Sequence, residues 1–294
     1  MGIRREPFIV LLLVAWCAFL PIPADAQTRP AATAVSVAAP GVIQELTLRD
    51  NTVLVGRVER IENGRALFRT SGGATLEVPL DQIVSVRDVA GRIVDGRAWR
   101  KDSNPTRLFF APTARSIPSG GGYAALYEGV MPFVQVGVTD RVSVGGGTPL
   151  WIGTGAHPLW FTPKVQLYAS EKTQAAVGVM HFFNIDHASF GIAYAVVTRG
   201  TDDSAVTAGI GLPYYKSTEY HGGNAVLMIG GEHRVSRVIK LITENYVLDG
   251  GTLLSGGVRF MGERFSADVA MVAPVSADTF VAFPMVNFVW KFGQ

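Results

Sequence analysis

The stretch from Asn287 to Phe292, close to the end of the sequence, alternates strictly between two kinds of residue. Successive side chains of a β-strand point to opposite faces, so one face of this strand would carry only bulky apolar residues. The bulky face holds Phe288, Trp290 and Phe292, and the opposite face holds Asn287, Val289 and Lys291. A strand of this kind suits a β-barrel whose outer wall contacts lipid and whose interior is polar.

Similar alternating segments recur from residue 122 onward, and together they predict an antiparallel barrel of about twelve strands. Most segments are long enough to cross the apolar layer of a membrane at a tilt. They are Gly122–Tyr127, Met131–Thr139, Val142–Trp151, Trp160–Ser170, Gln174–Phe183, Ser189–Gly200, Ser204–Tyr215, Asn224–Val235, Ile239–Leu248, Thr252–Met261, Phe265–Val275 and Phe280–Phe292.

The connections between these segments alternate in length. Tight, charged turns fall at 139–141, 170–173, 201–203, 235–237 and 261–264. The other connections, which include the longer ones, fall at 152–159, 184–188, 216–223, 249–251 and 276–279. Short periplasmic turns opposite longer outer loops are typical of outer-membrane barrels. An even number of strands would then place both ends of the barrel on the periplasmic side.

Small or polar residues share one face of each segment, and larger apolar residues share the other. In 189–200 we expect Phe190, Ile192, Tyr194 and Val196 to face lipid, with Ser189 and Gly191 on the inner face. The alternative is a soluble β-sandwich, in which the large side chains would meet in one core. Aromatic residues near strand ends predict the interfacial girdles of a membrane barrel. These residues are Trp151, Trp160, Phe161, Tyr214, Tyr215, Phe265, Trp290 and Phe292.

Residues 1–26 have the pattern of a cleaved signal peptide. Arg4 and Arg5 precede an apolar run, and Ala24-Asp25-Ala26 fits a signal-peptidase site; a twin-arginine signal is the alternative to ordinary export. Cys17 is the only cysteine and lies in this segment, so we expect a mature chain without disulfides.

Composition narrows the classes that remain for an exported chain. No apolar stretch after residue 26 approaches the ~20 residues that a membrane helix needs. The chain is 48% hydrophobic and 17% charged and has 33 glycines, which favours a periplasmic β protein or an outer-membrane barrel. The net charge of +2 is too small to indicate a nucleic-acid partner.

The chain is predicted to continue with a flexible lead-in (27–40), a small β domain (41–98), a linker (99–121) and the barrel (122–294). The small domain has short strands separated by turns such as Glu62-Asn63-Gly64 and Ser71-Gly72-Gly73. It resembles the small SH3-like or Sm-like barrels. Because such barrels are usually interaction modules, the resemblance implies a periplasmic protein or cell-wall partner; a structural plug or spacer is the alternative.

The region from Arg107 to the end resembles the predicted outer-membrane β-barrel proteins of Gram-negative bacteria. The resemblance includes the motif from Thr106 to Thr113 and the aromatic last strand. It implies an all-β, transmembrane, up-and-down barrel in contact with outer-membrane lipids and with the barrel-assembly machinery. Such barrels often end on a Phe that the machinery recognises, whereas here Phe292 is followed by Gly293 and Gln294.

Polar and charged residues predicted to face the barrel interior are the main candidates for function. They are Lys164, Gln166, Glu232, Arg234, Lys240, Glu244, Arg259, Asp268, Asn287 and Lys291. Charges inside a barrel must be hydrated or paired. They form either an ion-pair network that fills a narrow lumen or the lining of a pore or binding site. Basic residues outnumber acidic ones, so a pore would favour anions slightly.

His187 and Ser189, two residues apart on a strand, form the arrangement that most suggests catalysis. Some outer-membrane lipid hydrolases use such a pair, with a third polar residue that Asp186 or Asn184 would supply here. We expect Ser189 on the inner face, away from lipid, which argues against that chemistry. The five histidines lack metal-ligand spacing, so we predict no metal and no cofactor.

The sequence therefore predicts a non-enzymatic outer-membrane barrel with a structural or interaction role, or a narrow passive pore. A lipid hydrolase and a soluble periplasmic binding protein are the alternatives.

Overall fold

A computed structural model describes residues 35–39, 42–89, 91–150, 158–185, 188–216, 223–276 and 279–293. The predicted signal peptide with Cys17, and most of the lead-in at 27–40, lie outside these residues. The chain divides into two compact units, Met1–Val89 and Ala90–Gln294. In the described part of the chain, no helix has the length and apolar character needed to cross a bilayer.

The first unit contains a five-stranded antiparallel sheet in the order β4-β3-β2-β1-β5. Its elements are β1 (Ile43–Leu48), β2 (Val53–Glu62), β3 (Arg65–Thr70), β4 (Thr75–Pro79), the short 3₁₀ helix η1 (Leu80–Gln82) and β5 (Ile83–Val89). The β2–β3 turn contains Asn63 and Gly64, with φ angles of 49° and 73°, a conformation that Asn and Gly tolerate best. Leu46, Val58 and Phe68 lie at the centre of the core.

The second unit begins with a hairpin of β6 (Gly91–Val94) and β7 (Arg97–Arg100). The division between the units therefore falls after Val89, whereas the sequence predicted a small domain ending at residue 98.

The barrel strands follow. They are β8 (Gly122–Tyr127), β9 (Met131–Gly137), β10 (Val142–Gly147), β11 (Leu159–Ala169), β12 (Thr173–Ile185), β13 (Ala188–Gly200), β14 (Ser204–Lys216), β15 (Val226–Arg234), β16 (Ile239–Leu248), β17 (Gly251–Met261), β18 (Phe265–Ser276), the two-residue β19 (Thr279–Phe280) and β20 (Phe283–Phe292).

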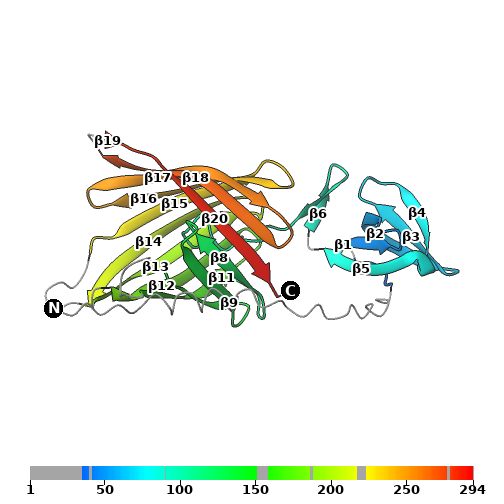
Figure 1. The fold of residues 1–294 in the computed structure, drawn as a ribbon, viewed down its shortest axis with the longest axis horizontal. Helices are drawn as coiled ribbons and strands as arrows, with labels where there is room; N and C mark the ends of the chain where they lie inside the picture. The colour runs from blue at the N-terminus through cyan, green and yellow to red at the C-terminus, as the bar shows by residue number, and fades with distance from the viewer. Residues whose placement is uncertain are drawn as a thin grey trace, which may run out of the picture. The chain divides into compact units, whose positions relative to one another are not determined.

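Each barrel strand from β8 to β18 pairs with its neighbour in sequence, and β20 closes the ring by pairing with both β18 and β8. In Figure 1, β20 (red) lies between β18 and β8. All these pairings are antiparallel, so the predicted twelve-stranded, up-and-down, closed barrel is confirmed. Closure leaves no unpaired strand edge, which the apolar interior of a bilayer could not satisfy.

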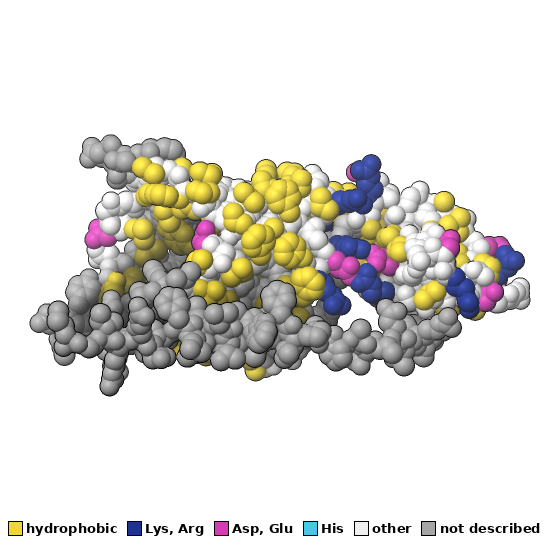
Figure 2. Space-filling view, viewed as in Figure 1, with side chains coloured by type: hydrophobic (Ala, Val, Ile, Leu, Met, Phe, Trp, Pro, Cys, Tyr) yellow, Lys and Arg dark blue, Asp and Glu magenta, His cyan; other side chains and the backbone are white. Residues whose placement is uncertain are grey.

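The outer wall of the barrel is apolar. On β14, Val206 and Leu212 are 55% and 56% exposed, and on β20 Trp290 is 54% exposed. Figure 2 shows hydrophobic side chains spread over the visible barrel wall. Large apolar side chains are exposed on this scale only where they meet lipid or another protein.

Strand β13 is the exception to the predicted faces. Val196 is only 4% exposed and Phe190 stacks on Phe182 at 4.8 Å, so the even-numbered residues from 190 to 196 face inward. Gly191 lies on the outer face, where the ring of Tyr214 occupies the place that a side chain would take. The prediction was wrong here because the interior holds apolar protein instead of water alone, and large side chains therefore suit both faces.

Candidate functional site in the barrel lumen

The predicted linker at 99–121 lies largely inside the barrel. Residues 102–117, here called the inner segment, are all buried or half-buried, and Leu108 and Phe109 are 0% exposed. These two side chains form one core with Val196, Met228 and other inward-facing residues of the barrel wall. The linker prediction is therefore wrong for these residues, because their apolar side chains are buried by the barrel.

The inner segment enters the lumen and turns back on itself. The Thr113 N–H donates to the Thr106 carbonyl at 2.9 Å, and the Leu108 N–H donates to the Ala111 carbonyl at 2.9 Å. These bonds close a tight turn at residues 108–111, here called the tip. The tip leaves backbone N–H groups that cannot pair within the turn, and buried N–H groups need partners.

Glu244 on β16 supplies those partners. Its Oε2 accepts hydrogen bonds from the N–H groups of Phe109, Phe110 and Ala111 at 2.8, 2.9 and 2.9 Å. Its Oε1 accepts a hydrogen bond from the Tyr246 hydroxyl at 2.6 Å. A carboxylate is well suited to this place because its bonds to N–H donors are charge-assisted.

Arg259 on β17 joins the inner segment to the barrel wall through its guanidinium. It forms a bidentate ion pair with Asp268 on β18, with N···O distances of 2.7 and 3.0 Å. It also donates to the carbonyls of Asn104, at 2.6 Å, and Leu108. Arg259 is 0% exposed, so wall and segment share one fully desolvated cation.

A second cluster holds the base of the segment. Lys240 on β16 donates to Asp102 at 2.6 Å and to Glu232 at 3.0 Å, and Glu232 also pairs with Arg115. Asp102 lies on the inner segment and not on a spanning strand. Its burial alone would raise its pKa, but Lys240 and Arg259 outweigh that effect and hold the pKa below its ordinary value.

The remaining lumen candidates lie on the inner face as well. Lys164 donates to the carbonyls of Thr113 and Arg115 at 3.1 and 2.7 Å, Gln166 donates to Ala114 at 2.8 Å, and Asn287 donates to Phe109 at 3.3 Å. Lys291 is half-buried and lines a small cavity beside the segment. Seven of the ten candidates thus bond directly to the inner segment, namely Lys164, Gln166, Glu232, Lys240, Glu244, Arg259 and Asn287.

Arg234 has a different role. It lies at the tight-turn end, where it donates to the Arg100 carbonyl at 2.6 Å and pairs with Asp203 at 3.2 Å. Its guanidinium carbon lies 4.8 Å from the centre of the Trp99 ring. Asp203 also pairs with Arg92, so these contacts attach the β6–β7 hairpin to the barrel rim.

Arg107 was not among the predicted site residues, although it is the centre of a third cluster. Its guanidinium donates to Tyr123, to the Phe110 carbonyl at 2.8 Å and to Gln135 at 3.1 Å, and it lies over the Phe133 ring. The sequence signal that could have identified Arg107 is its position beside the apolar run that starts at Leu108.

Two predicted interfacial aromatics face inward instead. Trp160 is 4% exposed and stacks on Phe133 at 5.9 Å, because Gly147 on the neighbouring strand leaves room for its ring. Tyr215 lies on the inner face, where its ring is 6.0 Å from that of Phe190, although it is 46% exposed. Adjacent residues of a strand face opposite ways, so Tyr214 takes the outer position and bonds to His181 at 2.8 Å.

The other predicted aromatics are on the outer face or lie outside the described residues. Phe161, Phe265, Trp290 and Phe292 are 43%, 43%, 54% and 37% exposed. Trp151 lies outside the described residues.

The His187–Ser189 pair is described only in part. His187 and Asp186 lie outside the described residues, as does the Asn184 side chain. Ser189 pairs with Lys216 in the β13–β14 register, on the face opposite to Phe190. It therefore faces outward, and the prediction that it faces the lumen was wrong for the same reason as the rest of β13. Among the described residues, no group of His, Cys, Asp and Glu is placed to hold a metal ion.

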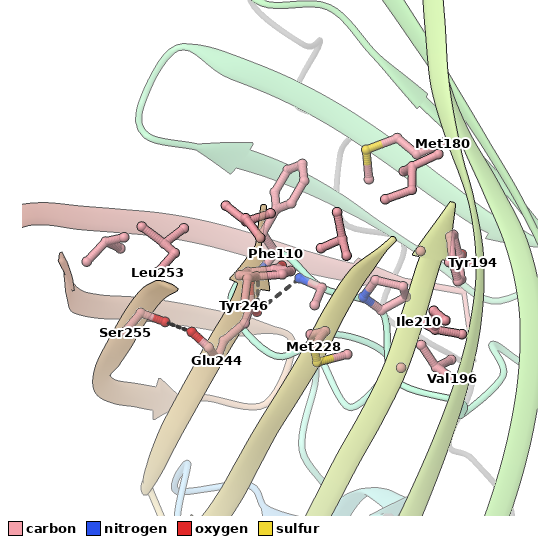
Figure 3. Close-up of a pocket in the computed structure, with 18 of the residues that line it drawn as sticks. Phe110, Met180, Tyr194, Val196, Ile210, Met228, Glu244, Tyr246, Leu253 and Ser255 are labelled. Carbon is pink, nitrogen blue, oxygen red and sulfur yellow. Dashed lines mark hydrogen bonds between the residues drawn. The ribbon is translucent and has the colours of Figure 1, made fainter. Parts of the chain in front are cut away.

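Beyond the tip, toward the longer connections, the lumen holds a cavity of about 460 Å³. Phe110 and Ala111 of the tip border it on one side, and Met180, Met228 and Leu253 of the wall line it (Figure 3). This cavity could not be predicted from the sequence, because it depends on which β13 residues face inward.

No protein-family model matches the sequence, and no curated protein matches it. Solved structures with a similar arrangement include the KdgM porin in complex with disordered oligogalacturonate, at 7% identity and a TM-score of 0.45, covering 58% of this chain and 98% of that one. The loop L8 deletion mutant of OmpT, an outer membrane protein of Vibrio cholerae, is 11% identical with a TM-score of 0.35 and covers 86% and 97%. The Acinetobacter baumannii outer membrane protein Omp33 is 10% identical with a TM-score of 0.32 and covers 59% and 96%.

These similarities are too low to carry conclusions about this chain. Its own closed ring of antiparallel strands and its apolar outer wall are those of an outer-membrane β-barrel protein.

Proposed function

We propose that this barrel is closed by its own inner segment and serves as a membrane anchor for the small β domain, not as an open pore. The observation that carries the proposal is the bonding of Arg259, which is fully buried and joins Asp268 of the wall to the carbonyls of Asn104 and Leu108. An open pore would need these groups in water, each with its own hydration.

The charges of the second unit support a closed lumen. Among the described residues of this unit, six basic and four acidic side chains are buried: Arg107, Arg115, Lys164, Arg234, Lys240 and Arg259, and Asp102, Glu232, Glu244 and Asp268. Each has a hydrogen-bond partner in the wall, the turns or the inner segment. Removing one partner of a buried ion pair costs about 3–5 kcal/mol, so release of the segment without new partners is strongly unfavourable.

The anchoring role follows from the first unit, which has a hydrophobic core of its own. The five-stranded sheet, the short η1 helix and the return of β5 to β1 support the resemblance to SH3-like barrels. We propose that this unit lies in the periplasm, where a periplasmic protein or the cell wall would be its partner. Outer-membrane lipids and the barrel-assembly machinery would be the partners of the barrel.

Conductance of the full chain in planar lipid bilayers tests closure. The wild type should show almost no steady conductance, whereas a variant with residues 106–113 replaced by Gly and Ser should conduct. Steady conductance of the wild type would overturn the proposal. An equally silent replacement variant would show that the wall itself, and not the inner segment, blocks the lumen.

Cell fractionation combined with a heat-modifiability gel tests the location, because folded barrels migrate differently before boiling. The full chain should fractionate with the outer membrane. Co-sedimentation with cell-wall sacculi, with and without residues 42–89, tests the anchor role. Recovery of the chain as a water-soluble monomer would contradict the membrane assignment.

A further inference from the structure

The cavity beyond the tip is built almost entirely from carbon. Met180, Ile192, Val196, Met228, Leu253 and Met285 line it. Three of these residues are methionines, whose flexible side chains adapt to ligands of different shape. Figure 3 shows Met180 and Met228 on different strands around this space, with Phe110 beside it.

Glu244, Tyr246 and Ser255, at the edge of the cavity, already have hydrogen-bond partners. Glu244 uses Oε2 for the N–H groups of the tip and Oε1 for the Tyr246 hydroxyl. Ser255 donates its hydroxyl to the Glu244 carbonyl. A polar or charged ligand would therefore find few free groups here and would lose its hydration.

Glycines on β14 keep the space open. A Cβ on Gly211 would lie 2.3 Å from the Ile192 side chain, and a Cβ on Gly209 would lie 2.7 Å from that of Val196. Any larger residue at these inward positions would push its neighbours into the cavity. The cavity thus depends on two positions without side chains.

Water alone is a poor occupant of this space, because buried water needs two to four polar partners for each molecule. Pockets that bind small molecules measure about 300–1,000 Å³ and are mostly apolar, so this cavity is within their range. An apolar cavity of about 150 Å³ holds one benzene, so by proportion about 460 Å³ would hold roughly 18 non-hydrogen atoms.

We infer that the cavity is a binding site for an uncharged, apolar molecule of this size. The inference rests on the proposed function, because the tip of the inner segment forms one side of the site. The bound molecule and the closed segment would stabilise each other, since each covers apolar surface of the other.

Fluorescence titration with N-phenyl-1-naphthylamine, an uncharged aromatic probe of suitable size, tests the inference. The full chain is studied in amphipol without free detergent. Saturable binding is expected, with displacement by methyl laurate but not by maltose. The same preparation is checked for barrel folding by heat modifiability and for closure by planar-bilayer conductance.

A matched pair of variants locates the probe. Met228 and Ile229 are adjacent on β15. Met228 is 7% exposed and faces the cavity, whereas Ile229 is 55% exposed and faces the lipid. Met228→Trp should fill the cavity and weaken binding by about tenfold or more, whereas Ile229→Trp should change it by less than about twofold. Leu253→Trp fills the cavity from β17 and decides the question if Met228→Trp does not fold.

The outcomes separate the two proposals. A folded, non-conducting wild type without saturable binding, or binding that maltose displaces, would overturn the site and leave the closed barrel standing. Equal binding by wild type and the folded cavity-filling variants would also overturn the site. Conductance by the wild type would overturn the closed barrel, whatever the probe does.

Discussion

Replacing Arg259 with Met should release the inner segment. The guanidinium joins the Asp268 carboxylate, the Asp102 carboxylate at 3.4 Å and the carbonyls of the inner segment. Met has a similar length and is apolar, so it fills most of the space but leaves both carboxylates of Asp268 and Asp102 without this cation. Asp102 keeps its ion pair with Lys240, whereas Asp268 loses both of its contacts with the guanidinium of Arg259.

The magnitude follows from the burial of this group. Both Arg259 and Asp268 are at most 1% exposed, and removing one partner of such a pair costs about 3–5 kcal/mol. Since each 1.4 kcal/mol is a factor of ten, the population with a displaced segment should rise by about a hundred- to several-thousand-fold. Water can enter the lumen once the inner segment is displaced. Part of the cost of the unpaired carboxylate is therefore recovered, but only in the open state.

The assay is single-channel recording in planar bilayers, paired with urea unfolding in lipid vesicles. Arg259→Met should give frequent open events, and the double variant with Asp268→Asn should recover part of the lost stability, because no buried charge is then left unpaired. Arg141→Met, at an exposed tight turn, is the control and should behave as the wild type. A silent, fully stable Arg259→Met variant would refute the argument that this ion pair holds the segment.

Four smaller changes test other parts of the structure. Glu244→Gln removes the charge from the bonds to the tip and should give fewer open events than Arg259→Met, in the same recordings. Val269→Arg on the lipid-facing wall should lower the free energy of unfolding in vesicles by about 2–4 kcal/mol. Phe68→Ala should cost about 3–5 kcal/mol in the small unit, which limited proteolysis would detect while the heat-modifiability shift of the barrel stays unchanged. Ser189→Ala should leave esterase activity of the purified protein unchanged; loss of an existing activity would favour the lipid-hydrolase alternative.

The barrel could be predicted from the sequence because its signals are local. Alternation with a period of two, turn residues at regular intervals and an even number of segments are all properties of neighbouring residues. The last strand illustrates this: Asn287 is 1% exposed and Trp290 is 54% exposed, on the faces expected for each. Polar residues were equally informative, since the wall has no other place for a group such as Arg259 than the interior.

The inner segment could not be placed in this way, because its position depends on contacts far apart in the chain. Glu244 and the tip are more than a hundred residues apart in sequence. The run from Leu108 to Ala111 is apolar and follows Arg107, a combination that an exposed linker would leave poorly solvated. That combination indicated burial, but only the closed ring shows which surface buries it.

The reversal of β13 follows from the same segment. Alternation of residue types along a strand indicates that its two faces differ. Assigning one face to lipid and the other to the lumen assumes that the lumen is wet and polar. Here Leu108 and Phe109 fill part of the lumen with apolar side chains, and Val196 packs against them in one core. Tyr194 and Ile192 continue the same face into the cavity beyond the tip. Where a barrel is filled by its own chain, the larger apolar face of a strand can therefore be the inner one, and small residues such as Ala195 then suffice on the side of the lipid.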